Sequence, residues 1–398
     1  MTDEDVENKI TLRDQAGKKL KIAIATTGRF HVLDLARELA ALGHDIVFYS
    51  ILPRSRAVRF GLPAASHRAL LPWLAPLVAA QYFGGPVVRR IVNPWTKRAV
   101  DWLIARRLEP CDVLIGMSGL CIESARIARE RYGAKVFIER GSRHIESQKE
   151  ILDEVKRLSP DAQSVPDYAV TTELASYKLA DVVVVPSRHS ADSFVERGFP
   201  PERLFRNPYG VDLAMFRPTP APIRITPTVI YVGAWSYQKG CDLLTAAIAR
   251  SSGSVRLIHV GAVSDAPLPD QAWFQHQDPV QQWQLPDWYG RANVFVLASR
   301  QEGLALVQAQ ALACGLPVVC TDRTGGKDLF ELLGLTEGIF VVPYDDVEAL
   351  VDAIGQALSW CERHHPEGAL RDLLGNRREQ LSWKAYAKRY EDRLGNID

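Results

Sequence analysis

The amino-acid sequence predicts an α/β protein built from two doubly wound domains, each with a parallel sheet. Three observations support this prediction. The chain has 398 residues, a length typical of two domains. Short apolar runs rich in β-branched residues alternate with helical patterns from Leu20 onward, as in sheets joined by crossover helices. A proline-rich stretch, residues 217–227, separates the two halves, because it can neither continue a helix nor join a central strand.

Apolar runs mark the expected strands of each half. Between the first two runs, His31–Leu42 has apolar residues at helical spacing, and Gly43 follows as a C-terminal stop. The strands expected in the first half are Ile22–Thr26, Asp45–Tyr49, Asp112–Gly116, Lys135–Glu139 and Asp181–Pro186. Those expected in the second half are Val229–Val232, Val255–Val260, Val294–Ala298, Pro317–Cys320 and Ile339–Val342.

Composition excludes several classes of protein. The 48 basic residues balance 47 acidic ones, which argues against binding nucleic acid over a broad surface. The first 19 residues are polar and charged, unlike a signal peptide, and no run of about 20 uncharged apolar residues occurs. The six cysteines are scattered without a C-x-x-C pair, so we expect reduced thiols in a cytoplasmic protein, with no disulfide framework and no metal site.

The segment Leu297–Val319 carries the strongest functional signal. After the expected strand, a loop holds Glu302 and Gly303, and a helix is expected to begin near Leu304. A helix N-terminus presents N–H groups and positive partial charge, which suit a phosphate group or sugar hydroxyls. Glu302 can accept hydrogen bonds from hydroxyls, and Gln310, about two turns along, lies on roughly the same helix face. A capping carboxylate and an ordinary solvent-facing glutamine would give the same pattern.

This segment belongs to an ordered set of motifs. Three further motifs lie in the second half or just before it: Tyr209–Pro218, Tyr231–Gly240 and Thr321–Gly326. Two more lie in the first half: Arg29–Asp45 and Asp181–Arg188. Together they resemble the retaining glycosyltransferases of family 4, the glycosyl transferases of group 1. The resemblance extends over nearly the whole chain, and it implies the GT-B fold, in which two Rossmann-like domains face a cleft.

The resemblance also implies domain boundaries. A polar N-terminal tail, residues 1–18, precedes an acceptor-side domain, 19–214, and a nucleotide-sugar-binding domain, 215–378, follows. Residues 379–398 resemble the family's C-terminal helix that returns to the N-terminal domain.

Roles for residues follow from the same resemblance. Glu302 is expected to contact the hydroxyls of the donor sugar, and Lys239 to bind the donor's diphosphate, where a positive charge neutralises the departing group. Gln310 is expected to reach the ribose. Backbone amides of Gly303, Leu304, Ala305 and Leu306 are expected to cradle the sugar and the diphosphate.

Two positions depart from the family's pattern. The family usually has arginine five residues before the lysine, where this chain has Ala234, and a second glutamate where this chain has Gln310. A fixed positive charge beside a leaving group stabilises the transition state by a few kcal/mol, and this stabilisation is lost where the arginine is absent. Three arginines on predicted loops are candidates to compensate: Arg140, Arg143 and Arg188.

The first half contributes weaker candidates. Gly28 and Arg29 follow the first expected strand, in a loop that in the family lies near the donor phosphates and the acceptor; Gly28 also fits an ordinary turn. The run Glu139–Glu146 follows another strand and concentrates charge, which often marks a cleft. The possible substrate contacts are Arg29, Glu139, Arg140, His144 and Arg188, although ion pairs between neighbours and a helix start at His144 would explain the run equally well.

Residues 51–110 carry ten Lys or Arg against one Asp and one Glu, interleaved with tryptophans. We expect a peripheral contact with anionic lipid there, at the inner face of a membrane; a solvated basic face around a helical hairpin is the alternative.

The sequence thus predicts transfer of a sugar from a nucleoside diphosphate sugar to a glycan or lipid-linked acceptor, in cell-surface polysaccharide or lipid-linked glycan synthesis, without a cofactor, a metal or nucleic acid. The first alternative is a catalytically silent GT-B protein that binds a sugar or a partner enzyme. Epimerisation of a sugar nucleotide is disfavoured, because the acid and base carboxylates that it needs are not evident.

Overall fold

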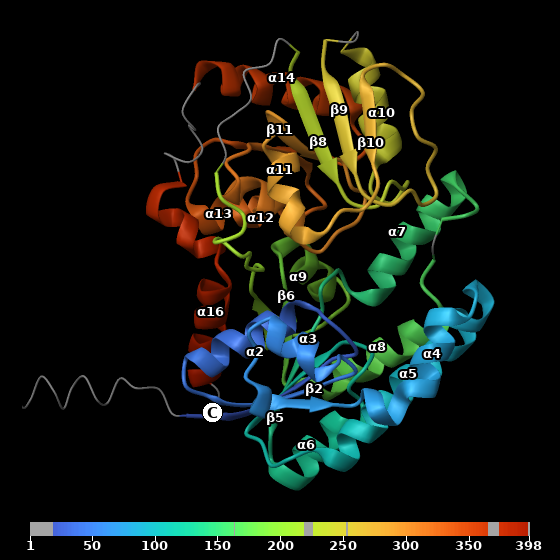
Figure 1. Cartoon of the computed structure of the whole chain (residues 1–398), viewed down its shortest axis with the longest axis vertical. Helices are drawn as coiled ribbons and strands as arrows, with labels where there is room; N and C mark the ends of the chain where they lie inside the picture. The colour runs from blue at the N-terminus through green and yellow to red at the C-terminus, as the bar shows by residue number, and fades with distance from the viewer. Residues whose placement is uncertain (1–18, 163, 219–225, 252–253, 365–373, 397–398) are drawn as a thin grey trace, which may run out of the picture. The chain divides into compact units, whose positions relative to one another are not determined.

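The computed structural model describes residues 19–162, 164–218, 226–251, 254–364 and 374–396. The predicted polar tail, 1–18, and most of the proline-rich stretch, 219–225, lie outside the described residues. The chain divides into two compact units. Unit 1 comprises residues 1–138, 175–181 and 387–398, and unit 2 comprises residues 139–174 and 182–386 (Figure 1).

The first sheet has seven strands in the order β3-β2-β1-β4-β5-β6-β7. Its central strands are buried because their residues are apolar on both faces, as in β1, where four of five residues are buried. Ile22 aligns with Ile46 on one side and with Val113 on the other, both in parallel register. The strands are β1 (Lys21–Ala25), β2 (Asp45–Ser50), β3 (His67–Ala69), β4 (Val113–Met117), β5 (Lys135–Glu139), β6 (Val182–Val185) and β7 (Leu204–Arg206).

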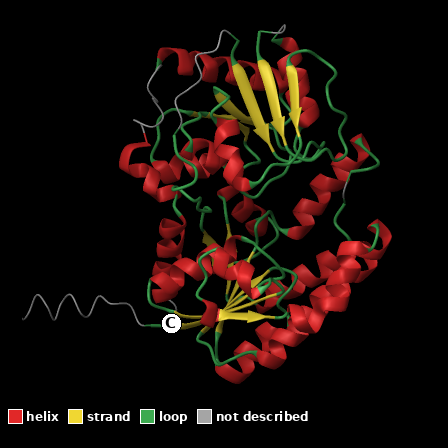
Figure 2. Ribbon diagram, in the orientation of Figure 1, coloured by secondary structure: helices red, strands yellow, loops and turns green. Residues whose placement is uncertain are grey.

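The second sheet has six parallel strands in the order β10-β9-β8-β11-β12-β13. Its helices flank it on both sides (Figure 2). Every residue of β8, β11 and β12 is buried. The strands are β8 (Thr228–Val232), β9 (Arg256–Val260), β10 (Phe274–Gln277), β11 (Val294–Leu297), β12 (Val318–Thr321) and β13 (Ile339–Val342). The predicted fold class, α/β with two doubly wound parallel sheets, is confirmed.

Helices connect the strands, and one predicted helix start needs correction. The helix that follows Glu302, α12, begins at Leu306 and not near Leu304, so Leu304 and Ala305 belong to the loop. The helix α2 (His31–Ala41) ends where predicted, with Gly43 at a positive φ of 100° just beyond it. The longer helices of the first half are α3 (Arg54–Arg59), α4 (Leu71–Phe83), α5 (Pro86–Arg107), α6 (Glu123–Tyr132), α7 (Ile145–Leu158), α8 (Asp167–Leu179) and α9 (Arg188–Val195). Those of the second half are α10 (Cys241–Arg250), α11 (Leu285–Tyr289), α12 (Leu306–Ala313), α13 (Gly326–Leu333), α14 (Val347–Arg363) and α16 (Trp383–Gly395). Short 3-10 turns are η1 (Ala64–Ser66), η2 (Pro201–Arg203), η3 (Gln282–Gln284) and η4 (Gly375–Leu381).

Most of the segment predicted to be basic and aromatic, residues 71–107, folds as two packed helices, α4 and α5, joined by Gly84 and Gly85. Figure 1 shows them side by side in light blue within unit 1. No helix in the described part of the chain combines the length and the apolar character that a bilayer crossing requires.

Candidate functional site

Two loops of unit 2 bring the predicted catalytic residues together. Lys239 lies in the loop after β8, and Glu302 lies in the loop after β11. These strands are parallel neighbours, so their carboxyl ends, and the loops that leave them, meet at one edge of the sheet. The Nζ atom of Lys239 donates a hydrogen bond to Oε1 of Glu302 as an ion pair, and both side chains are largely shielded, 22% and 17% exposed.

Hydrogen bonds between the two loops fix this pair. The backbone N–H of Arg300 donates to the carbonyl oxygen of Gln238 at 2.9 Å, and the Gln238 amide donates to Oε1 of Gln301 at 2.9 Å. The loops are therefore joined through the residues directly next to Lys239 and Glu302.

Gly240 allows the loop after β8 to approach its neighbour. It has a positive φ of 66°, and a Cβ atom at this position would lie 1.9 Å from the carbonyl oxygen of Ala298. Any other residue would be strained in backbone conformation and would also collide with backbone. The Lys239 side chain is thereby held against the carboxyl end of β11.

A half-buried ion pair stabilises the same region, and the sequence analysis did not predict it. Arg300 donates from Nη1 to Oδ1 of Asp242 at 2.6 Å and from Nη2 to Oδ2 at 2.8 Å, with a third bond to the Tyr237 carbonyl oxygen at 2.7 Å. The Arg300 side chain is only 6% exposed. Such a bidentate pair fixes geometry as well as charge. A single arginine in a motif gives no sign of a partner 58 residues away.

Two further loops of unit 2, which follow β5 and β6, pack against the Glu302 loop. The amide of Gln301 donates to Oγ of Ser142 at 2.5 Å, and the Ser187 hydroxyl donates to the Gly303 carbonyl oxygen at 2.7 Å. A Cβ atom on Gly303 would lie 2.1 Å from the carbonyl oxygen of Gly141. Gly303 is therefore required by close packing between backbones.

The residues after Gly303 lead into α12. Leu304 and Ala305 are buried, and Leu306 is the first helical residue. Gln310 lies inside the helix at 5% exposure, where its Oε1 accepts a hydrogen bond from the Tyr289 hydroxyl at 3.2 Å. Gln310 is thus a buried residue of unit 2 and not a solvent-facing one.

The charged run after β5 is held inside unit 2. Glu139 and Arg140 are 1% and 8% exposed. Arg140 pairs with Glu173 at 3.1 Å and donates to Oε1 of Gln148 at 2.5 Å, and its Nε donates to a backbone carbonyl oxygen. All three guanidinium nitrogens of Arg140 are thereby bonded within the protein.

His144 stands immediately before α7. It is 5% exposed, its ring meets Phe194 edge-on at 4.9 Å, and its backbone N–H donates to Oγ of Ser193 at 2.8 Å. Burial, together with the positive charges of Arg197 and Arg140, lowers the pKa of His144 to about 4. Its ring is therefore neutral at physiological pH.

Arg143, between these two residues, has a different environment. It contacts the His189 ring at 3.2 Å and pairs with Glu196 at 3.2 Å. Its Nε atom is buried, and within the described residues it has no hydrogen-bond partner; the same holds for Nη1 of Arg323, whose guanidinium stacks on Tyr344. Burial and the charges of Arg143 and Arg323 lower the pKa of His189 to about 3. The backbone N–H of Glu302 donates a hydrogen bond to the carbonyl oxygen of Arg323, and Ser142, next to Arg143, bonds Gln301. Arg143 and Arg323 therefore adjoin residues that contact the Glu302 loop.

The remaining predicted residues lie elsewhere. Arg188 pairs with Glu331 at 3.0 Å on the surface of unit 2. Gly28 and Arg29 belong to unit 1, in the loop after β1, where the Arg29 guanidinium stacks on the Phe60 ring at 3.8 Å. Ala234, at the departure from the family's pattern, is exposed, and its carbonyl oxygen accepts a bond from the Tyr231 hydroxyl at 2.7 Å.

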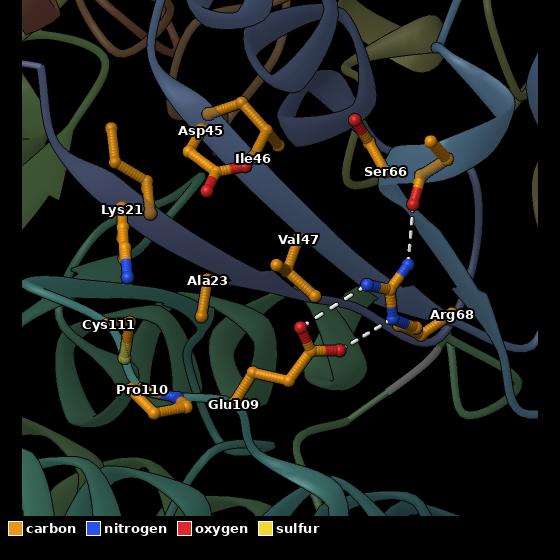
Figure 3. Close-up of a pocket in the computed structure, with 12 residues that line it drawn as sticks. Lys21, Ala23, Asp45, Ile46, Val47, Ser66, Arg68, Glu109, Pro110 and Cys111 are labelled. Atoms are coloured by element: carbon orange, nitrogen blue, oxygen red, sulfur yellow. Dashed lines mark hydrogen bonds and ion pairs between the residues drawn. The ribbon is translucent and has the colours of Figure 1, made fainter.

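Unit 1 also contains a pocket of about 370 Å³ (Figure 3). It lies where β1 and β2 begin, near Lys21 and Asp45, whereas open α/β sheets bind ligands at the carboxyl ends of their strands. Its Arg68 side chain is paired with Glu109 at 2.6 Å. The pocket therefore lies at the opposite end of its strands from the edge at which the site in unit 2 is built.

Comparisons with known proteins identify the family of the chain. Residues 27–210 match the family described as Glycosyl transferase 4-like domain, and residues 226–359 match Glycosyl transferases group 1. The chain belongs to the family 4, or group 1, glycosyltransferases. The two sheets are accordingly those of the GT-B fold, and Lys239 and Glu302 fall inside the second matched region.

Individual relatives match over parts of their length. The D-inositol 3-phosphate glycosyltransferase of Xylanimonas cellulosilytica is 29% identical over 51% of this chain and 54% of its own. A GDP-mannose-dependent phosphatidylinositol monomannoside mannosyltransferase of Mycolicibacterium smegmatis is 31% identical over 45% of this chain and 53% of its own. The chain therefore matches about half the length of these curated relatives. The structure of Anabaena HepE in complex with UDP-glucose has the same fold, with a TM-score of 0.64 at 12% identity over 95% of this chain and all of that one.

The described residues contain no cluster of three or more His, Cys, Asp or Glu side chains arranged to hold a metal ion.

Proposed function

We propose that the protein transfers a sugar from a nucleoside diphosphate sugar to a hydroxyl group of an acceptor, with retention of the anomeric configuration. The observation that carries this proposal is the ion pair between Lys239 and Glu302 on two adjoining loops of a group 1 glycosyltransferase chain. A lysine and a carboxylate held together at the carboxyl edge of a parallel sheet offer opposite charges to the two ends of a sugar phosphate.

Each group has a role in this reaction. On donor binding, Glu302 exchanges Lys239 for hydroxyls of the sugar, and Lys239 turns to the diphosphate. The bond between the anomeric carbon and the diphosphate oxygen breaks, and the acceptor oxygen bonds to that carbon. The acceptor's proton passes to the departing diphosphate. Lys239 and the N–H groups that lead into α12 stabilise the charge that develops on the leaving group.

Arg143 is the strongest substitute for the arginine absent at Ala234. Arg140 is fully bonded within the protein, and Arg188 pairs with Glu331. Arg143 adjoins Ser142, which bonds the Glu302 loop, and it keeps a buried Nε donor with no partner among the described residues. A guanidinium with donors to spare suits a phosphate oxygen.

The acceptor is proposed to be a glycan or a lipid-linked sugar. The name of one relative supports this class, since that enzyme is named for phosphatidylinositol monomannoside, a lipid-linked sugar.

A thermal-shift screen of the full chain with UDP, GDP, ADP and their sugars tests donor binding. A ligand at about 100 times its dissociation constant adds ~2.7 kcal/mol of stability, so one nucleotide and its sugars are expected to raise the melting temperature clearly. Lys239→Met should lose this shift, and Lys327→Met, at an exposed lysine of the same unit, should keep it. No shift with any nucleotide would contradict the proposal.

Ala234 and Gln310 favour a second candidate, a silent protein that binds sugar nucleotides or a partner. Hydrolysis of the selected donor, or its transfer to an acceptor, separates the two. Donor binding without either reaction would favour the silent protein.

A further inference from the structure

The helix α4 is apolar around its whole circumference and yet lies mostly at the surface. Its 13 residues, LPWLAPLVAAQYF, include no charged side chain, and only Leu74 is buried. A helix that is apolar on every side normally lies inside a protein core or against a membrane. α4 therefore exposes a surface that water does not favour.

The exposed apolar surface continues into α5. Eight of the fifteen large hydrophobic side chains that are exposed among the described residues lie in this one hairpin. Phe83 and Tyr82, at its turn, are 87% and 77% exposed. The eight are Trp73, Tyr82, Phe83, Val87, Val88, Ile91, Trp95 and Trp102. Scattered exposed hydrophobics are ordinary, but a contiguous patch marks an interaction surface.

Positive charge surrounds this patch. Residues 71–107 contain six Lys or Arg and a single acid, Asp101. Asp101 is buried, and it accepts hydrogen bonds from the backbone N–H groups of Glu123 and Ser124 at the start of α6. Its charge is therefore used inside the protein and does not offset the basic surface.

Several of these arginines lie over tryptophan rings. Arg106 stacks on Trp102 at 4.3 Å, and Arg107 stacks on Trp73 at 4.2 Å. Rings beside cationic groups are typical of the boundary between lipid headgroups and acyl chains, where the ring is buried and the charge meets phosphate.

The turn of the hairpin is closed by its own hydrogen bonds. Arg89 donates from Nε to the Gln81 carbonyl oxygen at 2.9 Å and from Nη2 to the Tyr82 carbonyl oxygen at 3.3 Å. These bonds satisfy carbonyl groups at the end of α4, which would otherwise oppose entry into an apolar phase. The turn thus presents aromatic side chains on a satisfied backbone.

We infer that the α4–α5 hairpin docks this protein on an anionic phospholipid membrane, with Tyr82 and Phe83 entering the interface and the arginines contacting phosphate. Charge complementarity selects this occupant, because an apolar protein groove gains nothing from six cations, whereas an anionic bilayer binds both features together. The hairpin lies within unit 1, and the Lys239–Glu302 pair lies in unit 2.

Flotation of the full chain with vesicles tests the inference. Vesicles of phosphatidylcholine alone are compared with vesicles of phosphatidylcholine and phosphatidylglycerol in equal parts, at low and high salt. The protein is expected to float with the anionic vesicles at low salt and to be released at high salt, where exposed charges are screened. No donor or acceptor is present, so this result is independent of the proposed activity.

Two pairs of variants separate the apolar contribution from the charge contribution. Each double variant is expected to lower the vesicle-bound fraction by ~10-fold or more. Tyr82→Ser with Phe83→Ser removes apolar groups, and Arg90→Glu with Arg98→Glu reverses charges. The controls are Trp283→Ser, at a tryptophan 66% exposed in unit 2, and Arg131→Glu with Arg256→Glu, at exposed arginines outside the hairpin; both should float like the unchanged protein. Melting temperatures of all variants confirm folding, since the replaced side chains are exposed.

Flotation that is equal with neutral and anionic vesicles, or unchanged by the hairpin variants, would overturn the inference. So would a dimer in lipid-free solution that the Tyr82→Ser, Phe83→Ser variant converts to a monomer, because the hairpin would then be covered by a second copy.

Discussion

Two regions of the molecule differ in the side chains that they expose to solvent. The loops of unit 2 that carry Lys239 and Glu302 shield charged side chains, whereas the α4–α5 hairpin of unit 1 exposes apolar ones. In the loops, charged groups are shielded and paired: Lys239 with Glu302, and Arg300 with Asp242. In the hairpin, apolar groups are exposed, and Phe83 has 87% of its surface in contact with solvent.

The difference indicates two kinds of ligand. Shielded charges interact strongly with a small charged molecule, because screening by water is reduced around them. An exposed apolar patch with basic neighbours gains free energy only from a large surface that covers it and carries opposite charge. Substitutions in the loops should therefore change the rate of the proposed reaction, and substitutions in the hairpin should change binding to membranes.

The largest effect is expected for Glu302→Ala. We expect turnover to fall by ~1000-fold, because the proposed contacts to the donor sugar are lost in a site where preorganised groups carry much of the catalysis. Steady-state kinetics with the donor selected by thermal shift measure the change. Vesicle flotation of this variant should be unaltered.

Glu348→Ala is the matched control, since this glutamate of unit 2 is 76% exposed and pairs only with Arg250 among the described contacts. It should retain full turnover. Equal turnover of Glu302→Ala and the unchanged protein would remove Glu302 from the mechanism and weaken the contrast between the two regions.

The central strands were predictable from the sequence, because strands such as β8 and β11 are continuous apolar runs. The sequence did not predict that these two strands are neighbours, which is what brings their loops together at one edge of the sheet. The strands that the sequence did not mark, β3, β7 and β10, all lie at the edges of the sheets. They are short or polar, as in Phe274–Gln277, so no apolar run distinguishes them from loops.

Partners that are distant in sequence were not predictable. The bond between Gln301 and Ser142 joins residues 159 positions apart, and nothing in either motif specifies it. The charge of Arg140 marked it as a substrate contact, whereas the structure pairs it with buried Glu173. Its role toward a substrate stays a prediction. Local patterns identify which loops carry chemistry, and tertiary packing decides which charges are already paired.

A smaller effect is expected for Ala234→Arg, which restores the family's usual residue at an exposed position. The added charge should tighten binding of the nucleoside diphosphate by ~10-fold, as one charge-assisted hydrogen bond provides. Isothermal titration with UDP or GDP measures it. Leu158→Arg, at an exposed residue at the end of α7 in the same unit, is the control and should leave the affinity unchanged. Unaltered or weaker affinity in Ala234→Arg would indicate a rearranged pocket.

The smallest effect concerns the buried histidine beside the loops. Because burial lowers the pKa of His144 to about 4, the unfolded chain binds a proton near pH 6 that the folded chain does not. This histidine therefore stabilises the fold less as pH falls from about 6.5 toward 4, and the loss between pH 6.5 and 5.5 is about 1 kcal/mol. Below about pH 4 the folded state also binds the proton, so the contribution of His144 to stability no longer changes with pH.

Urea unfolding of the unchanged protein and of His144→Gln, at several pH values across this window, measures the difference. The variant is expected to lose less stability on acidification, even if it is less stable at neutral pH, because glutamine does not titrate. Trp283→Ser, which removes an exposed side chain of unit 2 that carries no titratable group, serves as the control and should retain the full dependence of the unchanged protein. If His144→Gln and the unchanged protein lost equal stability between pH 6.5 and 5.5, the ring of His144 would be accessible to protons in the folded state. The loops of unit 2 would then be less shielded than the contrast with the hairpin requires.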